Sequence, residues 1–253
     1  MSPGRAIRTL RELLEARTSI VIRRQPERDS LAWATRRLIH AARIDLVIDV
    51  GAHHGDYGHF LRDTVQYRGR IRSLEPASGS FDALTARTRK DALWEIERIA
   101  LGAQAGEALL HTYKHSYMNS LLPVSTYGSA NFAAHFDESQ PQPDEMVTVR
   151  TLGEYLANSP QGAKTMLKLD TQGHDLPILQ SGASYLRDIC GLQLEIPLHA
   201  LYEGSPTHVE CFTALQDFGF DIVSITPVSR SLDGIRLAEV DCLAINRSTQ
   251  LSV

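Results

Sequence analysis

Short apolar segments that end at a glycine or an acidic residue alternate with helical segments along most of this chain of 253 residues. The clearest is Leu46–Val50, which is almost wholly apolar and runs into Gly51, as expected of a strand buried on both faces. Four more segments have the same character, namely residues 71–74, 94–101, 166–169 and 192–196. Such alternation predicts an α/β fold of Rossmann-like type with a mostly parallel, doubly wound sheet.

Apolar residues recur at helical spacing between these strands. The spacing predicts helices near residues 81–89, 151–156, 176–186 and 209–218. Further strands are expected at residues 108–113 and 147–149, and residues 222–225 and 239–245 are expected to close the sheet as an antiparallel hairpin. The segment 114–145 is polar and interrupted by proline and glycine, which indicates either a lid or binding loop, or surface padding.

The front of the chain is predicted to be a helical extension. Apolar residues at helical spacing in 7–14 and 31–39 indicate two helices, with Pro26 between them. We therefore divide the chain into an N-terminal helical extension, 1–44, and one globular unit, 45–253. No stretch reaches the roughly 20 apolar residues of a membrane-spanning helix, and the first residues lack the apolar run of a secretion signal.

Charge and cysteine content limit the partners and the compartment. The formal net charge is −4, so the chain has no overall basic field to hold a polyanion, and a nucleic-acid substrate is disfavoured. Three cysteines, widely spaced and odd in number, fit a reducing compartment, and we expect a cytoplasmic protein. The sequence is compatible with a monomer and with a homo-oligomer.

The most informative segment is the turn that follows the first strand, with Asp49, Gly51 and Gly55. In an open α/β sheet, ligands bind beyond the carboxyl ends of the strands, and glycines there let the backbone approach a ligand. The dinucleotide fingerprint GxGxxG is absent, because His53 stands two residues after Gly51. Asp49 suits a ligand with a cationic amino-acid part, such as S-adenosylmethionine, better than a pyrophosphate. A purely structural turn is the alternative.

Glu75 strengthens the case for a nucleoside ligand. It ends the second predicted strand, 20 positions after Gly55 (75 − 55), where a carboxylate can accept from both ribose hydroxyls. Pro76 then ends the strand, and Ala100 and Leu101, at the end of the third strand, would offer an apolar wall to an adenine.

Motifs along most of the chain carry a resemblance to a known family. In order they are Val-Ile-Asp49-Val-Gly51-Ala52-x-x-Gly55-x-Tyr57, Leu74-Glu75-Pro76 with Phe81, Ala100-Leu101-Gly102, Asn119-Ser120-Leu121, Thr151-Leu152, Leu167-Lys168-Leu169-Asp170-Thr-Gln172-Gly173-His174-Asp175, Leu194-Glu195 and Tyr202-Glu203-Gly204. With them the chain resembles the FkbM family of S-adenosylmethionine-dependent methyltransferases over roughly residues 45–247.

This resemblance implies a class I methyltransferase fold, S-adenosylmethionine as methyl donor, and O-methylation of a hydroxyl on a sugar, glycolipid, polyketide or other secondary metabolite. Ala52 and Tyr57 belong to the motif expected to bind the donor. His53 departs from the family's usual asparagine, and Gln172 and His174 stand where the family usually has glutamate and alanine. The second departure puts in doubt any role that needs a carboxylate at position 172.

Methyl transfer to a neutral hydroxyl needs a group that takes its proton, or a metal that acidifies it. We expect Asp170, at the end of the fourth strand, to be the general base. Glu195 is expected to converge with it, either to share that role or to complete a site for a divalent cation such as magnesium, and His174 and His199 are alternative bases. Asn119 and Ser120 are expected either to contact donor or acceptor, or to form a turn.

Two other functions fit parts of the pattern. A nicotinamide-dependent oxidoreductase has the same order of strand, turn and acid, but the missing GxGxxG opposes it. A non-catalytic binding protein that keeps the fold is the second alternative.

Overall fold

The protein forms a central seven-stranded sheet in a computed structural model that describes residues 26–136, 142–160 and 162–252. Its strands are β1 (Leu46–Val50), β2 (Arg70–Leu74), β3 (Trp94–Glu97), β7 (Thr165–Leu169), β8 (Ile189–Pro197), β9 (Phe220–Arg230) and β10 (Leu237–Asn246). They lie in the order β3-β2-β1-β7-β8-β10-β9. The first five strands of that order pair in parallel, and β10 pairs antiparallel with both β8 and β9. The mostly parallel sheet and the closing hairpin were both predicted and are confirmed.

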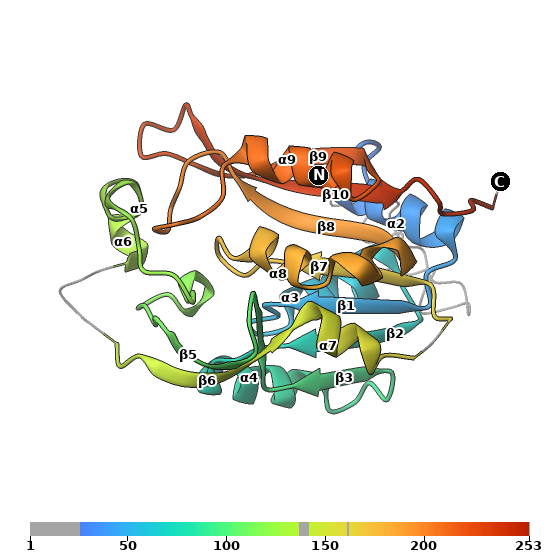
Figure 1. Cartoon of the computed structure of the whole chain (residues 1–253), viewed down its shortest axis with the longest axis horizontal. Coiled ribbons are helices and arrows are strands. Elements are labelled where there is room, and N and C mark those ends of the chain that lie inside the picture. The colour runs from blue at the N-terminus through green and yellow to red at the C-terminus, as the bar shows by residue number, and fades with distance from the viewer. Residues whose placement is uncertain (1–25, 137–141, 161, 253) are drawn as a thin grey trace, which may run out of the picture.

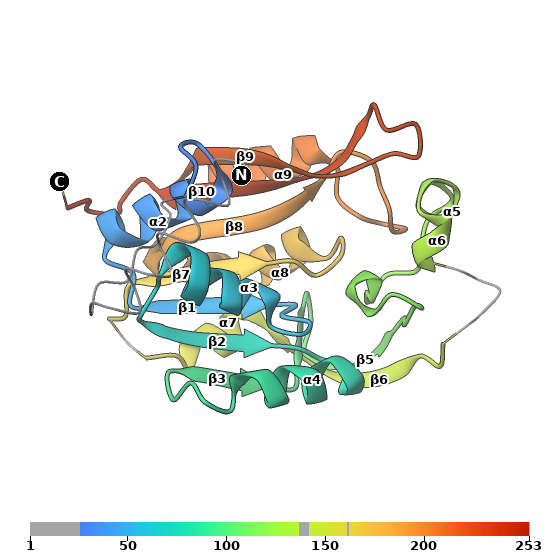
Figure 2. The ribbon, with the colours of Figure 1, turned by 180° about the vertical axis from the view of Figure 1, so that it is seen from behind.

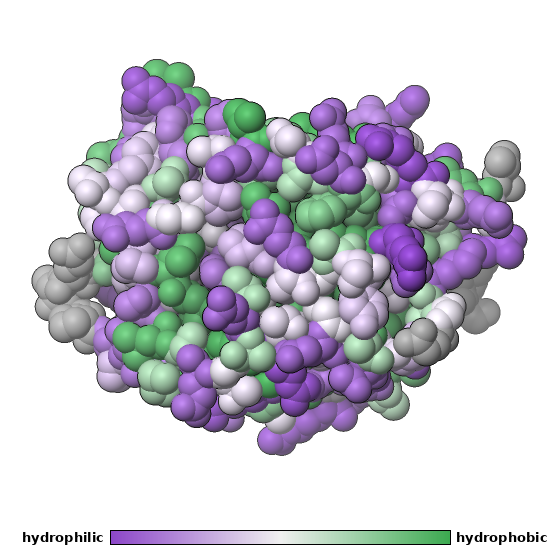
Figure 3. Space-filling view, viewed as in Figure 1, coloured by the Kyte–Doolittle hydropathy of each residue, from purple (hydrophilic) through white to green (hydrophobic). Residues whose placement is uncertain are grey.

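Helices cover both faces of the sheet (Figures 1 and 2). One face carries α2 (Leu31–Ala42), α3 (Asp56–His59) and α4 (Ser78–Thr88), and the other carries α7 (Leu152–Ala157), α8 (Asp175–Ser181) and α9 (His208–Asp217). Each layer has its own apolar cluster against the sheet, because strands buried on both faces present side chains to both sides. The outer surface over α7, α8 and α9 mixes hydrophilic and hydrophobic residues (Figure 3).

Helix α2 packs directly on the sheet. Ser30 caps its first turn by accepting from the backbone N–H of Trp33, and Leu38 and Ala42 join the apolar cluster that contains Val47 and Met166. The described part of the predicted extension therefore shares the core of the globular unit. The helix predicted at 7–14 lies outside the described residues. None of the helices within the described ranges is long and apolar enough to cross a membrane.

The strand predicted over residues 94–101 is divided between two sheets. Its first part is β3, and its second part is β4 (Ala100–Gly102), which joins β5 (Gly106–Leu110) and β6 (Glu145–Thr151) in a three-stranded sheet of order β4-β6-β5. Apolar periodicity could not show the break, because apolar residues occur on both sides of it, Trp94 and Ile96 before it and Ile99 to Leu101 after it. The second sheet stands beside the carboxyl ends of β1 and β2 (Figure 1).

The polar insertion after β5 has more structure than the sequence indicated. Its described part includes a 3-10 turn at Ser116–Met118 and two short helices, α5 (Thr126–Asn131) and α6 (Ala133–Phe136). Met118 and Phe136 pack with Tyr202, whose hydroxyl donates to the carbonyl oxygen of Met118 at 2.8 Å. The insertion is thereby held at the carboxyl ends of the parallel strands (Figures 1 and 2).

Candidate active site

A cleft of about 640 Å³ opens at the carboxyl ends of β1 and β2. Its apolar wall includes Pro76, Ile99, Ala100, Leu101, Leu110 and Leu121, and its polar lining includes His53, Glu75, Ser116, Asn119, Ser120, Asp170, Thr171 and Gln172. Its mixture of an apolar wall with a few polar groups is typical of small-molecule sites. We call it the first cleft.

The turn after β1 brings the backbone to the edge of this cleft. Gly51 has a φ of 74°, and a Cβ built on it would lie 1.9 Å from the carbonyl oxygen of Asp170. Only glycine fits there, because the backbone after β7 passes directly against it. Gly55 is the N-cap residue of α3 and has a φ of 84°, a left-handed conformation that glycine adopts without strain.

Glu75 is held against that turn by two backbone amides. Its Oε2 accepts from the N–H of His53 at 2.7 Å and its Oε1 from the N–H of Ala77 at 2.9 Å. The side chain is only 6% exposed, and burial raises its pKa to about 7 although both amides lower it. Each carboxylate oxygen keeps a second lone pair for a ligand hydroxyl. Glu75 thus lines the first cleft at the end of β2, and its contact with a ribose stays a prediction.

A second cleft, of about 880 Å³, adjoins the first. Its lining consists of Leu31, Gly51, Ala52, His53, Asp56, Tyr57, Phe60, Tyr117, Lys168, Asp170, Gln193, Glu195, Val228 and Asp241. Gly51, His53, Tyr117 and Asp170 line both clefts. The candidate base therefore lies where the two clefts meet, which suits a reaction between two bound molecules.

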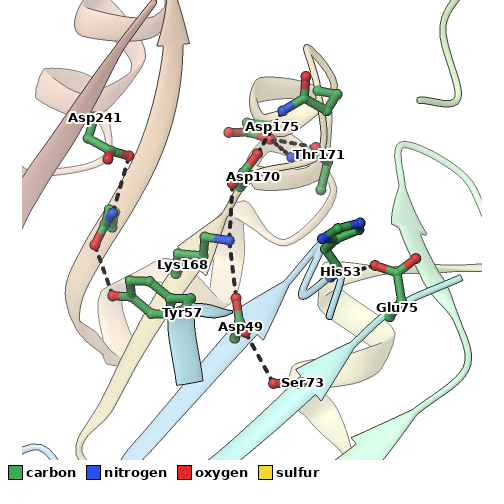
Figure 4. Close-up of polar contacts among 12 residues, drawn as sticks. Asp49, His53, Tyr57, Ser73, Glu75, Lys168, Asp170, Thr171, Asp175 and Asp241 are labelled. Atoms are coloured by element: carbon green, nitrogen blue, oxygen red, sulfur yellow. Dashed lines mark hydrogen bonds and ion pairs between the residues drawn. The ribbon is translucent and has the colours of Figure 1, made fainter. Parts of the chain in front are cut away.

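Asp49 lies beneath the clefts and lines neither of them. It is 0% exposed, accepts from Ser73 Oγ at 3.1 Å, and its Oδ1 lies 3.2 Å from Lys168 Nζ (Figure 4). Ser73, Asp49 and Lys168 are register partners on β2, β1 and β7, so their side chains point to the same face. The structure thus pairs Asp49 with a lysine of the protein, whereas the sequence predicted a role toward the donor.

Lys168 also contacts the candidate base. Its Nζ lies 3.3 Å from Asp170 Oδ2 and 5.2 Å from the centre of the Tyr57 ring. Burial opposes the ammonium charge, but the carboxylates of Asp170 and Asp49 outweigh it and raise the pKa of Lys168. A permanent cation therefore lies beside Asp170.

Asp170 and Glu195 converge, as predicted, but the side-chain amide of Gln172 lies between them. Nε2 of Gln172 donates to Asp170 Oδ1 and to Glu195 Oε2, each at 2.9 Å. Burial, followed by the nearby Asp170 and Glu239, raises the pKa of Glu195 well above its usual value. Within the described residues, no group of three or more histidine, cysteine or acidic side chains is placed to hold a metal ion. As arranged, the pair does not fit the divalent cation that the sequence suggested.

The remaining predicted residues fall into two groups. Asn119 and Ser120 line the first cleft, where Asn119 also accepts from the N–H of Tyr113 at 2.9 Å. The two histidines line neither of the two clefts: burial lowers the pKa of His174, and His199 stacks on Tyr127 with ring centres 4.7 Å apart.

Lys168, Gln193 and Asp241 had no predicted role. Ala52 and Tyr57, which were expected to bind the donor, line the second of the two clefts and not the first. Tyr57 Oη donates to Gln193 Oε1 at 2.9 Å, and Gln193 Nε2 donates to Asp241 Oδ1 at 3.2 Å, which places this chain of hydrogen bonds along the second cleft (Figure 4). Gln193 is the register partner of Lys168 on β8. A polar residue inside an otherwise apolar strand was the available signal for both of them.

Comparison with known proteins points to a methyltransferase family. The chain matches the methyltransferase FkbM domain over residues 49–222. It is similar in structure to the methyltransferase FkbM from Methylobacillus flagellatus KT, with a TM-score of 0.50, 13% identity, and coverage of 80% of this chain and 43% of that one. The chain thus spans less than half the length of that relative. No curated protein matches it.

Two further solved structures are similar at lower scores. The fibrillarin of Aeropyrum pernix, solved with natively bound S-adenosyl-L-methionine, has a TM-score of 0.46 and 13% identity. The alignment covers 83% of this chain and 73% of the fibrillarin chain. An rRNA methylase from Streptococcus thermophilus has a TM-score of 0.46 and 8% identity, and covers 88% of this chain and 99% of its own. The domain match extends over more than half of the chain and includes the end of β1, the glycine turn, Glu75, Asp170 and Glu195. The chain belongs to the FkbM family of methyltransferases and has the fold of class I S-adenosylmethionine-dependent methyltransferases.

Proposed function

We propose that this protein transfers the methyl group of S-adenosylmethionine to a hydroxyl oxygen of a small molecule or glycan, with Asp170 as general base. The observation that carries the proposal is the position of Asp170, which lines both clefts. In this proposal the first cleft binds the donor and the second binds the acceptor, so Asp170 can reach an acceptor hydroxyl beside the donor.

The residues of the first cleft fit the donor. Glu75 would accept from the ribose hydroxyls, because both of its oxygens are already oriented by backbone amides. The apolar wall that includes Ala100 and Leu101 would cover the adenine. When bound, the donor supplies a methyl carbon that is already activated by a sulfonium, so the protein mainly has to align the reactants and exclude water.

Asp170 has the surroundings that a base needs. Its side chain is 34% exposed, so an acceptor can reach it, while Lys168 contacts Oδ2 and Gln172 contacts Oδ1. Because both oxygens are oriented by donors from the protein, little reorganisation is needed when the carboxylate accepts the hydroxyl proton.

The charges of the second cleft bear on the acceptor. Its charged lining includes four carboxyl side chains and one lysine, namely Asp56, Asp170, Glu195, Asp241 and Lys168. Lys168 is already paired with Asp49 and Asp170, and Asp56 is paired with Arg87, so an anionic acceptor would still meet the carboxyl groups of Glu195 and Asp241. A neutral polyhydroxylated acceptor, such as a sugar, avoids that repulsion and can donate hydrogen bonds to the carboxylates.

Calorimetry with S-adenosylhomocysteine and with NAD tests donor binding. We expect the wild-type protein to bind the first and not the second. Binding of NAD alone would instead favour an oxidoreductase.

Turnover on a panel of hydroxylated acceptors tests the role of Asp170. Asp170→Asn should abolish transfer with little change in affinity for S-adenosylhomocysteine, and the exposed Asp217→Asn is the charge-matched control. An active Asp170→Asn variant would exclude Asp170 as base, and donor binding without transfer to any acceptor would favour a binding protein.

A further inference from the structure

Every polar group of the Gln172 side chain is engaged. Nε2 has two protons and gives one each to Asp170 Oδ1 and Glu195 Oε2, both at 2.9 Å. Oε1 lies 2.8 Å from the hydroxyl of Tyr202, whose single proton is shared between Oε1 and the carbonyl oxygen of Met118. The reverse orientation of the amide would set a carbonyl oxygen against two carboxylates, so the hydrogen-bond network fixes which end faces them.

The backbone of Gln172 is also constrained. Its φ is 55°, a left-handed conformation that is unfavourable for a residue with a Cβ. The carbonyl oxygen of Gln172 accepts from Ser120 Oγ at 2.8 Å, and Gly173 continues the turn with a φ of 91°. Contacts from the insertion and from the segment after β8 therefore hold this side chain in place.

Two carboxylates that approach one point repel each other unless something positive lies between them. A divalent cation bridged by oxygen ligands is one solution, and an amide N–H₂ that donates to both is another. Nε2 of Gln172 contacts one oxygen of each carboxylate, which is the position that a bridging cation would need.

We infer that Gln172 is a positioning residue, whose amide replaces a divalent cation between Asp170 and Glu195. This inference rests on the proposed role of Asp170 as base. The amide fixes the orientation of both carboxylates and leaves Asp170 Oδ2 to Lys168. Gln172→Glu would then place a third carboxylate on the same point and create a set of three oxygen ligands, which hard cations such as Mn²⁺ prefer.

Mn²⁺ titration of the purified proteins, followed by electron paramagnetic resonance, tests the inference without an acceptor. Gln172→Glu should gain one Mn²⁺ site at least tenfold tighter than any site in the wild-type protein. The double variant Gln172→Glu/Glu195→Gln should lose it. The exposed Gln216→Glu adds the same charge away from the site and should gain nothing.

Two results of this titration would overturn the inference. One is tight Mn²⁺ binding by the wild-type protein that Asp170→Asn abolishes, because a cation would then coexist with the amide. The other is a Gln172→Glu protein that binds no more Mn²⁺ than the wild type.

Thermal unfolding supplies a second measurement on the same variants. Gln172→Glu should melt below the wild type without cation, because three carboxylates repel, and Mn²⁺ should restore the melting temperature. If Gln172→Glu unfolds during purification, we expect the folded protein to be recovered when it is refolded with Mn²⁺, which supports the inference equally. Absence of recovery with Mn²⁺ counts against the inference.

Gln172→Met separates positioning from folding, since it keeps the length of the side chain and removes both donors. With an acceptor in hand, it should lower kcat at least tenfold and leave affinity for S-adenosylhomocysteine within twofold of the wild type. An unchanged kcat would contradict the positioning role. Failure of the wild type to bind S-adenosylhomocysteine would instead contradict the proposed function, so the two failures are distinguishable.

Discussion

Lys168 Nζ lies 3.2 Å from Oδ1 of Asp49, a carboxylate with 0% exposure at the centre of the sheet. The same ammonium lies 3.3 Å from Asp170, at the surface of both clefts. One cation therefore compensates a buried carboxylate and orients the proposed base. The stability of the sheet and the geometry of the candidate site depend on the same side chain.

Lys168→Met should destabilise the fold strongly, because it leaves Asp49 as an unpaired buried charge. Breaking one partner of a buried pair costs roughly 3–5 kcal/mol, and we expect a loss of that size in the free energy of unfolding by urea. The double variant Asp49→Asn/Lys168→Met removes both charges and should recover much of it. A loss below about 1 kcal/mol for Lys168→Met, typical of an exposed pair, would contradict the pairing.

Affinity for S-adenosylhomocysteine should depend on pH through Glu75. Its pKa is raised to about 7, chiefly by burial, and only the ionised form accepts from two hydroxyls with both oxygens. If the ligand binds only that form, affinity should be about tenfold lower at pH 6 than at pH 8. Isothermal calorimetry at the two pH values measures this ratio.

Glu75→Gln should bind the ligand more weakly at pH 8 and lose this pH dependence. The exposed Glu107→Gln is the control and should behave as the wild type. For the unliganded protein the sign is opposite: a carboxyl whose pKa rises on folding makes stability fall as pH rises from 4.5 to about 7. Equal affinity at both pH values would remove Glu75 from the ribose contact.

His53 should make the protein less stable in acid. Burial and then the neighbouring His54 lower its pKa from 6.5 to about 4, so the unfolded chain binds the proton more readily. Stability from this group is present above pH 6.5 and is lost as the pH falls toward 4. His53→Asn should therefore have a more favourable melting temperature, relative to wild type, at pH 5 than at pH 7.5.

Asparagine also tolerates the φ of 49° at position 53 better than most residues do. The variant loses the contact of 2.7 Å between His53 Nε2 and Ser116 Oγ, so its melting temperature at neutral pH should not exceed that of the wild type. His40→Asn, on the exposed face of α2, is the control. A pH-independent difference between His53→Asn and wild type would contradict the effect of burial on His53.

Gly51→Ala should prevent stable folding and, with it, the binding of S-adenosylhomocysteine. The added Cβ would lie 1.9 Å from the carbonyl oxygen of Asp170 at a φ of 74°, so β1 and β7 would have to separate. Gly79→Ala is the matched control, since nothing lies within 4 Å of the Cβ position and alanine favours the helix α4 by roughly 0.5–1 kcal/mol. Urea unfolding of both variants measures the contrast, and a stable Gly51→Ala protein would contradict the close approach.

Much of the fold could be read from the sequence because the strands are buried on both faces. Leu46–Val50 was predicted with the bounds that the structure has, since all of its residues except Asp49 are apolar and a glycine turn follows. The break between β3 and β4 was missed, because leaving one sheet for another changes the strand partners and not the apolar pattern. The short helices of the insertion were missed for a related reason, since four to six residues are too few for a clear period.

Local apolar periodicity and motif spacing along the chain were enough to predict the order of strands and helices, the placement of Glu75 and Asp170 at strand ends, and the family. They could not predict that Asp49 faces Lys168 or that Gln172 lies between Asp170 and Glu195, which became apparent in the folded chain. The register between strands and the path of the turn after β7 set those contacts, and both arise from packing between segments far apart in the sequence.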